Sequence, residues 1–196
     1  MKLTLTALFI AIIAVMCFTP LGYLKVGMVE ITLICIPVAA GAALLGKAGG
    51  TVLGLAFGVS SFLQCFGMSA FGAAILAVNP VLAGIICIVP RVAVGFFSAL
   101  IFEKLEKAEL NSAVGGAVTF LSASLINTVG FVGLLVLLMG KSEYITTMMQ
   151  GTGAKNLLVF AFIFAGTNSL IEAAASLVTG SAVGAVLSKL RKTKRP

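Results

Sequence analysis

Six long runs of apolar residues divide this chain, and they constrain its fold more than any other feature. They cover residues 3–23, 31–45, 51–66, 81–102, 113–139 and 157–187. About 20 helical residues cross the ~30 Å hydrocarbon core of a bilayer, so each run suits one span, although two are short and the last is long. Continuous apolar runs also lack the alternation of a membrane β-barrel. The sequence therefore predicts an all-α integral membrane protein with six transmembrane helices.

The composition supports a membrane location for the whole chain. Hydrophobic residues make up 60% and charged residues 10% of the sequence, whereas a soluble domain carries roughly 25% charged residues. We expect a single transmembrane domain over residues 1–188, followed by a basic tail over residues 189–196. The opening "MKLTLTALFIAIIAVMCF" is similar to a signal peptide, but no small-residue cleavage site follows it. It is interpreted as the first span.

The basic residues predict how the chain is oriented. Lysine and arginine accumulate on the cytoplasmic side of short loops. Six spans divide them as follows: Lys2, Lys47, Lys104, Lys107 and the tail "SKLRKTKRP" on one side, and Lys25, Lys141 and Lys155 on the other. Both termini are therefore predicted to be cytoplasmic, in a cell membrane. The same bias explains the net charge of +7, so nucleic-acid binding is not expected.

Several kinds of chemistry are excluded by what the sequence lacks. It contains no histidine, which rules out an H-E-x-x-H zinc site and a Ser-His-Asp triad. Its four cysteines stand singly in apolar runs and are interpreted as small core residues. "LLGKAGGTV" has a Gly-Lys pair but not the spacing of a phosphate-binding loop, so the chain does not hydrolyse ATP by itself. No cofactor or metal is expected.

Small residues recur every four positions in two of the runs. Gly46, Gly50, Gly54 and Gly58 form one stripe, and "ALFIA" places Ala7 and Ala11 on one face of the first span. Such stripes let helix backbones approach closely in lipid. The glycine stripe is interpreted as internal helix packing. For the alanine pair, internal packing and docking onto another membrane protein both stay open.

Polar residues inside the apolar runs are the strongest indication of function. "NPVLAGIICIVPRVAVGFF" places Arg91 ten residues into its span, or ~15 Å along a helix, where arginine costs at least ~2.5–3.5 kcal/mol. Glu172 lies midway along the last run, so the two residues can form a structural ion pair. A polar cavity that opens to the outside is the alternative, and it explains more of the polar residues in or near the spans: Glu30, Gln64, Asn79, Asn127 and Asn168.

Five stretches carry a resemblance that covers essentially the whole chain. They are "ALFIA", "IPVAAGAALLGKAGGTVLGLAFGVSSF", "VPRVAVGFFSALIFEKLEK", "SLINTVGFVGLL" and "GTNSLIEAAASLVTGSAVGAVLSKL". In order and spacing they resemble the substrate-binding membrane subunit, or S component, of energy-coupling-factor (ECF) vitamin transporters, and most of all its pantothenate branch.

The resemblance implies a six-helix subunit that captures a vitamin outside the cell. It implies delivery by toppling against a transmembrane coupling subunit, driven by two cytoplasmic ATPases, with Ala7 and Ala11 in the docking motif. The family often has aromatic-rich pockets, whereas this chain has no tryptophan and only two tyrosines, Tyr23 and Tyr144. This difference disfavours flat-ring vitamins such as thiamine and riboflavin.

Pantothenate suits the candidate binding residues, because it carries a carboxylate, an amide and two hydroxyls. Arg91 is expected to pair with the carboxylate and Asn127 with the amide. Gln64, Asn168 and Glu172 are expected to bind hydroxyls or hold Arg91, and Asn79 completes the set. Three alternatives remain: another vitamin or precursor (pyridoxine-type, folate or cobalamin), a self-contained secondary transporter, for which no internal repeat is evident, and an intramembrane enzyme, which the absent histidines disfavour.

Overall fold

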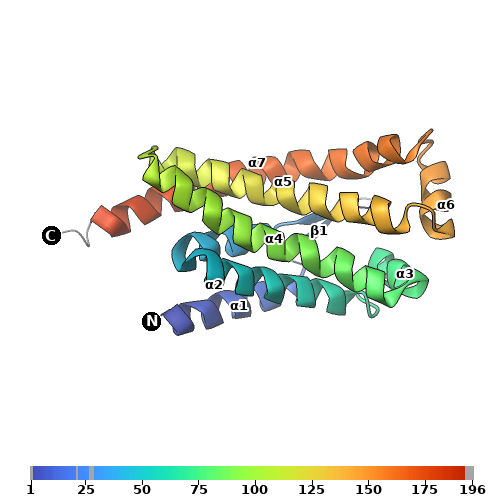
Figure 1. Ribbon diagram of the computed structural model, residues 1–196, viewed down its shortest axis with the longest axis horizontal. Helices are drawn as coiled ribbons and strands as arrows, with labels where there is room; N and C mark the ends of the chain where they lie inside the picture. Colours follow the sequence, from blue (N-terminus) through green and yellow to red (C-terminus); the bar gives the residue numbers. More distant parts are fainter. Residues whose placement is uncertain (1, 21, 27–28, 193–196) are drawn as a thin grey trace.

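The computed structural model is a bundle of long helices that run along one common direction (Figure 1). The structure describes residues 2–20, 22–26 and 29–192. In chain order its elements are α1 (Lys2–Cys17), β1 (Tyr23–Val26), β2 (Val29–Thr32), α2 (Cys35–Gln64), α3 (Ala70–Val78), α4 (Pro80–Lys107), α5 (Ser112–Met139), α6 (Glu143–Gly151) and α7 (Leu157–Lys192). The predicted all-α class is confirmed, because helices form the entire frame of the bundle.

One short β-hairpin interrupts the helices within the described part of the chain. Strands β1 and β2 pair antiparallel, with Tyr23 opposite Thr32, and β2 packs against α7. The sequence predicted a first apolar run that ends at Tyr23 and a second that starts at Ile31, so the hairpin occupies the segment between these runs and their adjoining ends. Strand β2, "VEIT", consists largely of β-branched residues, which favour strands.

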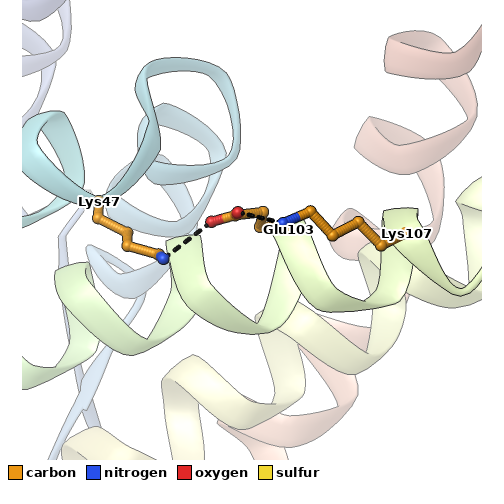
Figure 2. A network of polar contacts seen from close by, with 3 residues as sticks. All are labelled: Lys47, Glu103 and Lys107. Atoms are coloured by element: carbon orange, nitrogen blue, oxygen red, sulfur yellow. Dashed lines mark hydrogen bonds and ion pairs between the residues drawn. The ribbon is translucent and has the colours of Figure 1, made fainter.

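The two ends of the bundle differ in what they carry. Figure 1 shows the start of α1 and the end of α7 at one end, here called the termini end, and the short helices α3 and α6 at the other, here called the far end. Near the termini end, an ion pair of 3.1 Å between Lys47 and Glu103 joins α2 to α4, and Lys107 lies 2.8 Å from the same carboxylate within α4 (Figure 2).

Helix α2 reverses direction at Gly46. This residue has φ 77° and ψ −171°, a backbone conformation that glycine adopts without steric cost. The arms on either side of it fold against each other, since a Cβ built on Gly50 would lie 2.9 Å from the Cβ of Ala42. The two arms correspond to the second and third apolar runs, and the sequence predicted the break between them.

Three glycines of the stripe, Gly50, Gly54 and Gly58, pack inside the molecule as the sequence predicted, whereas Gly46 is exposed. Cβ atoms built on Gly50 and Gly54 would lie 2.3 Å from the backbone oxygens of Gly95 and Arg91 on α4. Helices α5 and α7 approach equally closely at Gly116, where a Cβ would lie 2.2 Å from the oxygen of Gly180. Backbones at this separation leave no room for side chains, so α2–α4 and α5–α7 form two tightly packed helix pairs.

Three described helices are long and apolar enough to cross a membrane: α2, α4 and α5. A fourth span results if the two parts of α7, Leu157–Gly166 and Ile171–Val186, are counted together across the 46° bend between them. Helix α1 is apolar but shorter. The six-span count and the cytoplasmic location of the termini therefore stay predictions.

Candidate functional site

Arg91 is held at the centre of α4 by a carbonyl group that a proline leaves free. Proline has no backbone N–H, so Pro90 cannot donate the usual helical hydrogen bond to the carbonyl oxygen of Ile86. The Arg91 Nη1 donates to this oxygen instead, at 2.9 Å. The adjacent proline and arginine thus satisfy within one helix two groups that would otherwise be unpaired in lipid.

Two aromatic rings cover the Arg91 guanidinium. Its Cζ lies 4.6 Å from the ring centroid of Phe131 on α5 and 5.6 Å from that of Phe57 on α2, distances at which a cation is attracted to an aromatic face. The whole residue is 5% exposed, and its Nε has no hydrogen-bond partner among the residues that the structure describes. The charge is stabilised by rings and a carbonyl, and one donor is left over.

Glu172 has a different set of partners. Its Oε1 accepts a hydrogen bond of 2.7 Å from the backbone N–H of Thr32 on β2. Its Oε2 accepts hydrogen bonds from the hydroxyls of Ser124 and Thr128 on α5, at 3.3 Å and 3.4 Å. The carboxyl group is 4% exposed and joins α7, α5 and the hairpin. No ion pair links Arg91 to Glu172 among the described side chains, so the structural ion-pair interpretation lacks the contact it requires.

Asn127 lies on α5 between the contacts of these two charged residues. Ser124 and Thr128 touch Glu172, while Phe131, one helical turn beyond Asn127, touches Arg91. Asn127 is 5% exposed, and its Oδ1 has no hydrogen-bond donor. A buried polar atom without a partner costs about 1–3 kcal/mol, and a bound molecule with an N–H or O–H group would relieve that cost. Arg91, Asn127 and Glu172 therefore form the central polar cluster.

The other predicted residues lie around this cluster or apart from it. Gln64, at the end of α2, donates through Nε2 to the backbone oxygen of Cys17 and so ties α2 to α1. Asn79 is the N-cap of α4: its Oδ1 accepts from the N–H groups of Val81 and Leu82, at 3.0 Å and 3.1 Å. Asn168 belongs to α7, one turn before Glu172, but its side chain lies outside the described structure.

Sequence reasoning missed the aromatic and hydroxyl partners of the cluster. Phe57 and Phe131 contact Arg91, and Ser124 and Thr128 contact Glu172. Helical spacing carried part of the signal, because Phe131 follows Asn127 by four residues and so lies on the same face. The contact with Thr32 has no comparable signal, because it joins a strand to a residue 140 positions away.

The alanine pair lies on the outer surface of α1. Ala7 and Ala11 are both exposed, while the opposite face of α1 packs on α2, where Phe9 meets Gly41. Neighbouring exposed residues on α1 are apolar, among them Leu8, which is 55% exposed. Within the described part of the chain, no packing covers the alanine face, which leaves it available to a partner.

Comparison with known proteins identifies the class to which this fold and polar cluster belong. The sequence matches the model of the ECF transporter, substrate-specific component, over residues 1–182, and no curated protein matches it. The chain belongs to this family. It is therefore a multi-pass membrane subunit of a transporter rather than an enzyme, and the family implies a vitamin-type substrate and an ECF module as partner.

The separate partners of Arg91 and Glu172 predict how their substitutions combine. Arg91→Ala removes the hydrogen bond to the Ile86 carbonyl oxygen and the contacts with two aromatic rings. We therefore expect the apparent melting temperature in detergent to fall by on the order of 5 °C. Glu172→Gln should lower it independently, and the double variant should show the sum of both losses. A double variant that regains wild-type stability would instead reveal a direct ion pair, because removing both partners of such a pair removes the penalty of a lone buried charge.

Proposed function

We propose that this protein is the pantothenate-capturing S component of an ECF transporter in a bacterial cell membrane. The observation that carries the proposal is the buried guanidinium of Arg91, whose Nε has no acceptor. A cation placed in an apolar core with an unused donor favours an anionic ligand, because a carboxylate supplies both the charge and the missing acceptor.

The geometry around Arg91 supports this ligand in one further respect. The rings of Phe57 and Phe131 lie near the guanidinium, and a guanidinium that stacks on rings with its faces still donates hydrogen bonds from its planar edge. Nη1 is engaged by Ile86, so the Nε side of the fork is the part that meets the ligand.

The unpaired Oδ1 of Asn127 favours a ligand that carries a hydrogen-bond donor in addition to its carboxylate. Asn127 Oδ1 needs a donor, and pantothenate brings an amide N–H and two hydroxyls as well as its carboxylate. Glu172 already accepts three hydrogen bonds, so in this proposal it fixes β2 and α5 around the ligand and leaves direct binding to Arg91 and Asn127. Gln64 and Asn168 remain candidates for hydroxyl contacts, and Asn79 acts by capping α4.

The proposed transport cycle uses the surface of α1. Six spans with cytoplasmic termini place the ligand cluster in the membrane, and toppling against the coupling subunit, driven by two ATPases, releases the ligand inside. The exposed Ala7–Ala11 face supports this step, because small side chains allow a partner helix to approach closely in lipid.

The ligand assignment is tested by thermal stabilisation of the purified protein. Ligand that binds only the folded state at a hundred times Kd adds about 2.7 kcal/mol, or about 5–10 °C for a chain of this size. We expect this shift with pantothenate and none with thiamine or riboflavin. Stabilisation by thiamine or riboflavin alone would refute the assignment.

Replacement of Arg91 should remove most of the affinity for pantothenate. Arg91→Ala should cost about 2–5 kcal/mol of binding, the range for truncating one partner of a buried charge pair. Arg91→Lys should recover little, because an ammonium group does not reproduce the planar fork. Isothermal titration of the folded variants measures both values, and wild-type affinity in Arg91→Ala would exclude Arg91 from the site.

The hydrogen bond from Arg91 to the Ile86 carbonyl can be tested by substituting two prolines of α4 in turn. Pro90→Ala restores a backbone N–H that competes with Arg91 for the Ile86 carbonyl, so affinity should fall in the wild-type background and stay unchanged in the Arg91→Ala background. Pro80→Ala is the control, because Pro80 lies in the first turn of α4, where a missing N–H breaks no helical bond.

The docking role of α1 predicts a separation of binding from uptake. Ala7→Leu and Ala11→Leu should block close approach of the coupling subunit, so vitamin uptake by cells should fall at least tenfold while the affinity of the isolated protein stays unchanged. Ala174→Leu, on the exposed surface of α7, is the control. Equal losses of affinity and uptake would show that the alanines act within the fold of this chain.

A further inference from the structure

Two cysteines from different helices meet beside the polar cluster. The Sγ atoms of Cys65 and Cys87 lie 3.8 Å apart, and both residues are buried. Cys65 follows the end of α2, whereas Cys87 lies within α4, four residues before Arg91 and therefore on the same helical face. The site described above makes no use of either thiol.

Cys65 lies at a helix end, where its Sγ donates to the backbone oxygen of Ser61 at 3.6 Å. Cys65 caps α2 and is followed by a turn in which Gly67 has φ 113°. On its other side lies Gly72 of α3, where a Cβ would come within 2.9 Å of the Cys65 Sγ. A disulfide needs an S–S distance of about 2.05 Å. Closing the bond therefore requires the Cys65 side chain, at a helix end beside a glycine, to rotate toward Cys87.

The charged Arg91 lies close to this pair. Its Nη1 reaches back along α4 to the Ile86 carbonyl, next to Cys87 in the sequence. The thiolate is the reactive form of cysteine, and a nearby cation favours it. Proximity to a second thiol and to a cation distinguishes this pair from ordinary buried cysteines.

We propose that Cys65 and Cys87 are a peroxide-reactive dithiol pair that closes to a disulfide between α2 and α4. A thiolate attacks one oxygen of hydrogen peroxide, the O–O bond breaks, and a sulfenic acid and hydroxide form; the hydroxide takes up the proton that the thiol released. The second thiol then attacks the sulfenic sulfur, and water leaves. The two cysteines lose two electrons and two protons, and one peroxide becomes two waters.

The position of the pair in the bundle fits such an oxidant. Cys87 lies seven residues from Pro80, or ~10 Å along the helix from the far end of α4. With the termini in the cytoplasm, as proposed above, the far end faces the outside, where disulfides form and persist. Hydrogen peroxide is small enough to reach buried thiols that larger disulfide reagents do not.

The test is a mass measurement on the full-length protein in detergent. After treatment with hydrogen peroxide the intact mass should fall by about 2 Da, two cysteines should become resistant to alkylation, and dithiothreitol should reverse both changes. Peptide mapping should locate the bond between Cys65 and Cys87. The oxidised protein should also melt at a higher temperature, because the cross-link restricts the unfolded chain.

Single substitutions decide whether the pair is responsible. Cys65→Ser and Cys87→Ser should each abolish the mass loss, and Cys35→Ser, another buried cysteine of α2, should leave it unchanged. If Cys87→Ser fails to fold, Cys65→Ser at the helix end gives the same answer. An unchanged mass, a gain of oxygen atoms without cross-linking, or a bond that involves Cys17 or Cys35 would each overturn the proposal. None of these readouts depends on which vitamin binds.

Discussion

The hydrogen bond from Arg91 to the Ile86 carbonyl is the interaction on which the central cluster depends. A charged group and an unpaired carbonyl each cost free energy in an apolar core. Pro90 leaves the Ile86 carbonyl unpaired, and this carbonyl then accepts a hydrogen bond from the charged Arg91, so each group satisfies the other. Because both partners of this hydrogen bond belong to α4, one helix supplies it alone. Phe57 and Phe131 then cover the guanidinium from α2 and α5.

The rest of the fold brings the other elements to this hydrogen bond. Glycines at close approach fix α2 on α4 at Gly54, whose neighbour across the interface is the backbone of Arg91 itself. Glu172 of α7 connects the remaining elements, because its carboxyl group accepts hydrogen bonds from two hydroxyls of α5 and from the backbone of β2. The cluster is thus assembled by short-range backbone contacts and one multiply bonded side chain, which explains how an apolar chain positions its few polar groups.

Apolar runs and glycine spacing predicted the helical class and the break at Gly46, because these features depend on local sequence. They also predicted the close packing at Gly50, Gly54 and Gly58, because a face of small residues allows helix backbones to approach closely. They also selected Arg91, Asn127 and Glu172, since a polar residue in a membrane span is conspicuous. Partners were harder to predict. The sequence shows that Arg91 and Glu172 need neutralising contacts. Whether they contact each other or separate partners depends on how the helices are rotated about their axes, which the spacing of apolar residues does not determine. The β-hairpin and its contact with Glu172 depend on tertiary structure alone.

The two closely packed helix pairs have a mechanical consequence for the ligand. Arg91 belongs to the α2–α4 pair, whereas Asn127 and Glu172 belong to the α5–α7 pair, and α4 meets α5 where Pro90 lies against Gly130. A molecule that contacts Arg91 and Asn127 together therefore spans the seam between two stiff bodies. In the proposed binding mode, the energy of these contacts favours one angle between the two pairs, so an occupied subunit is expected to present its outer helices as a single rigid surface.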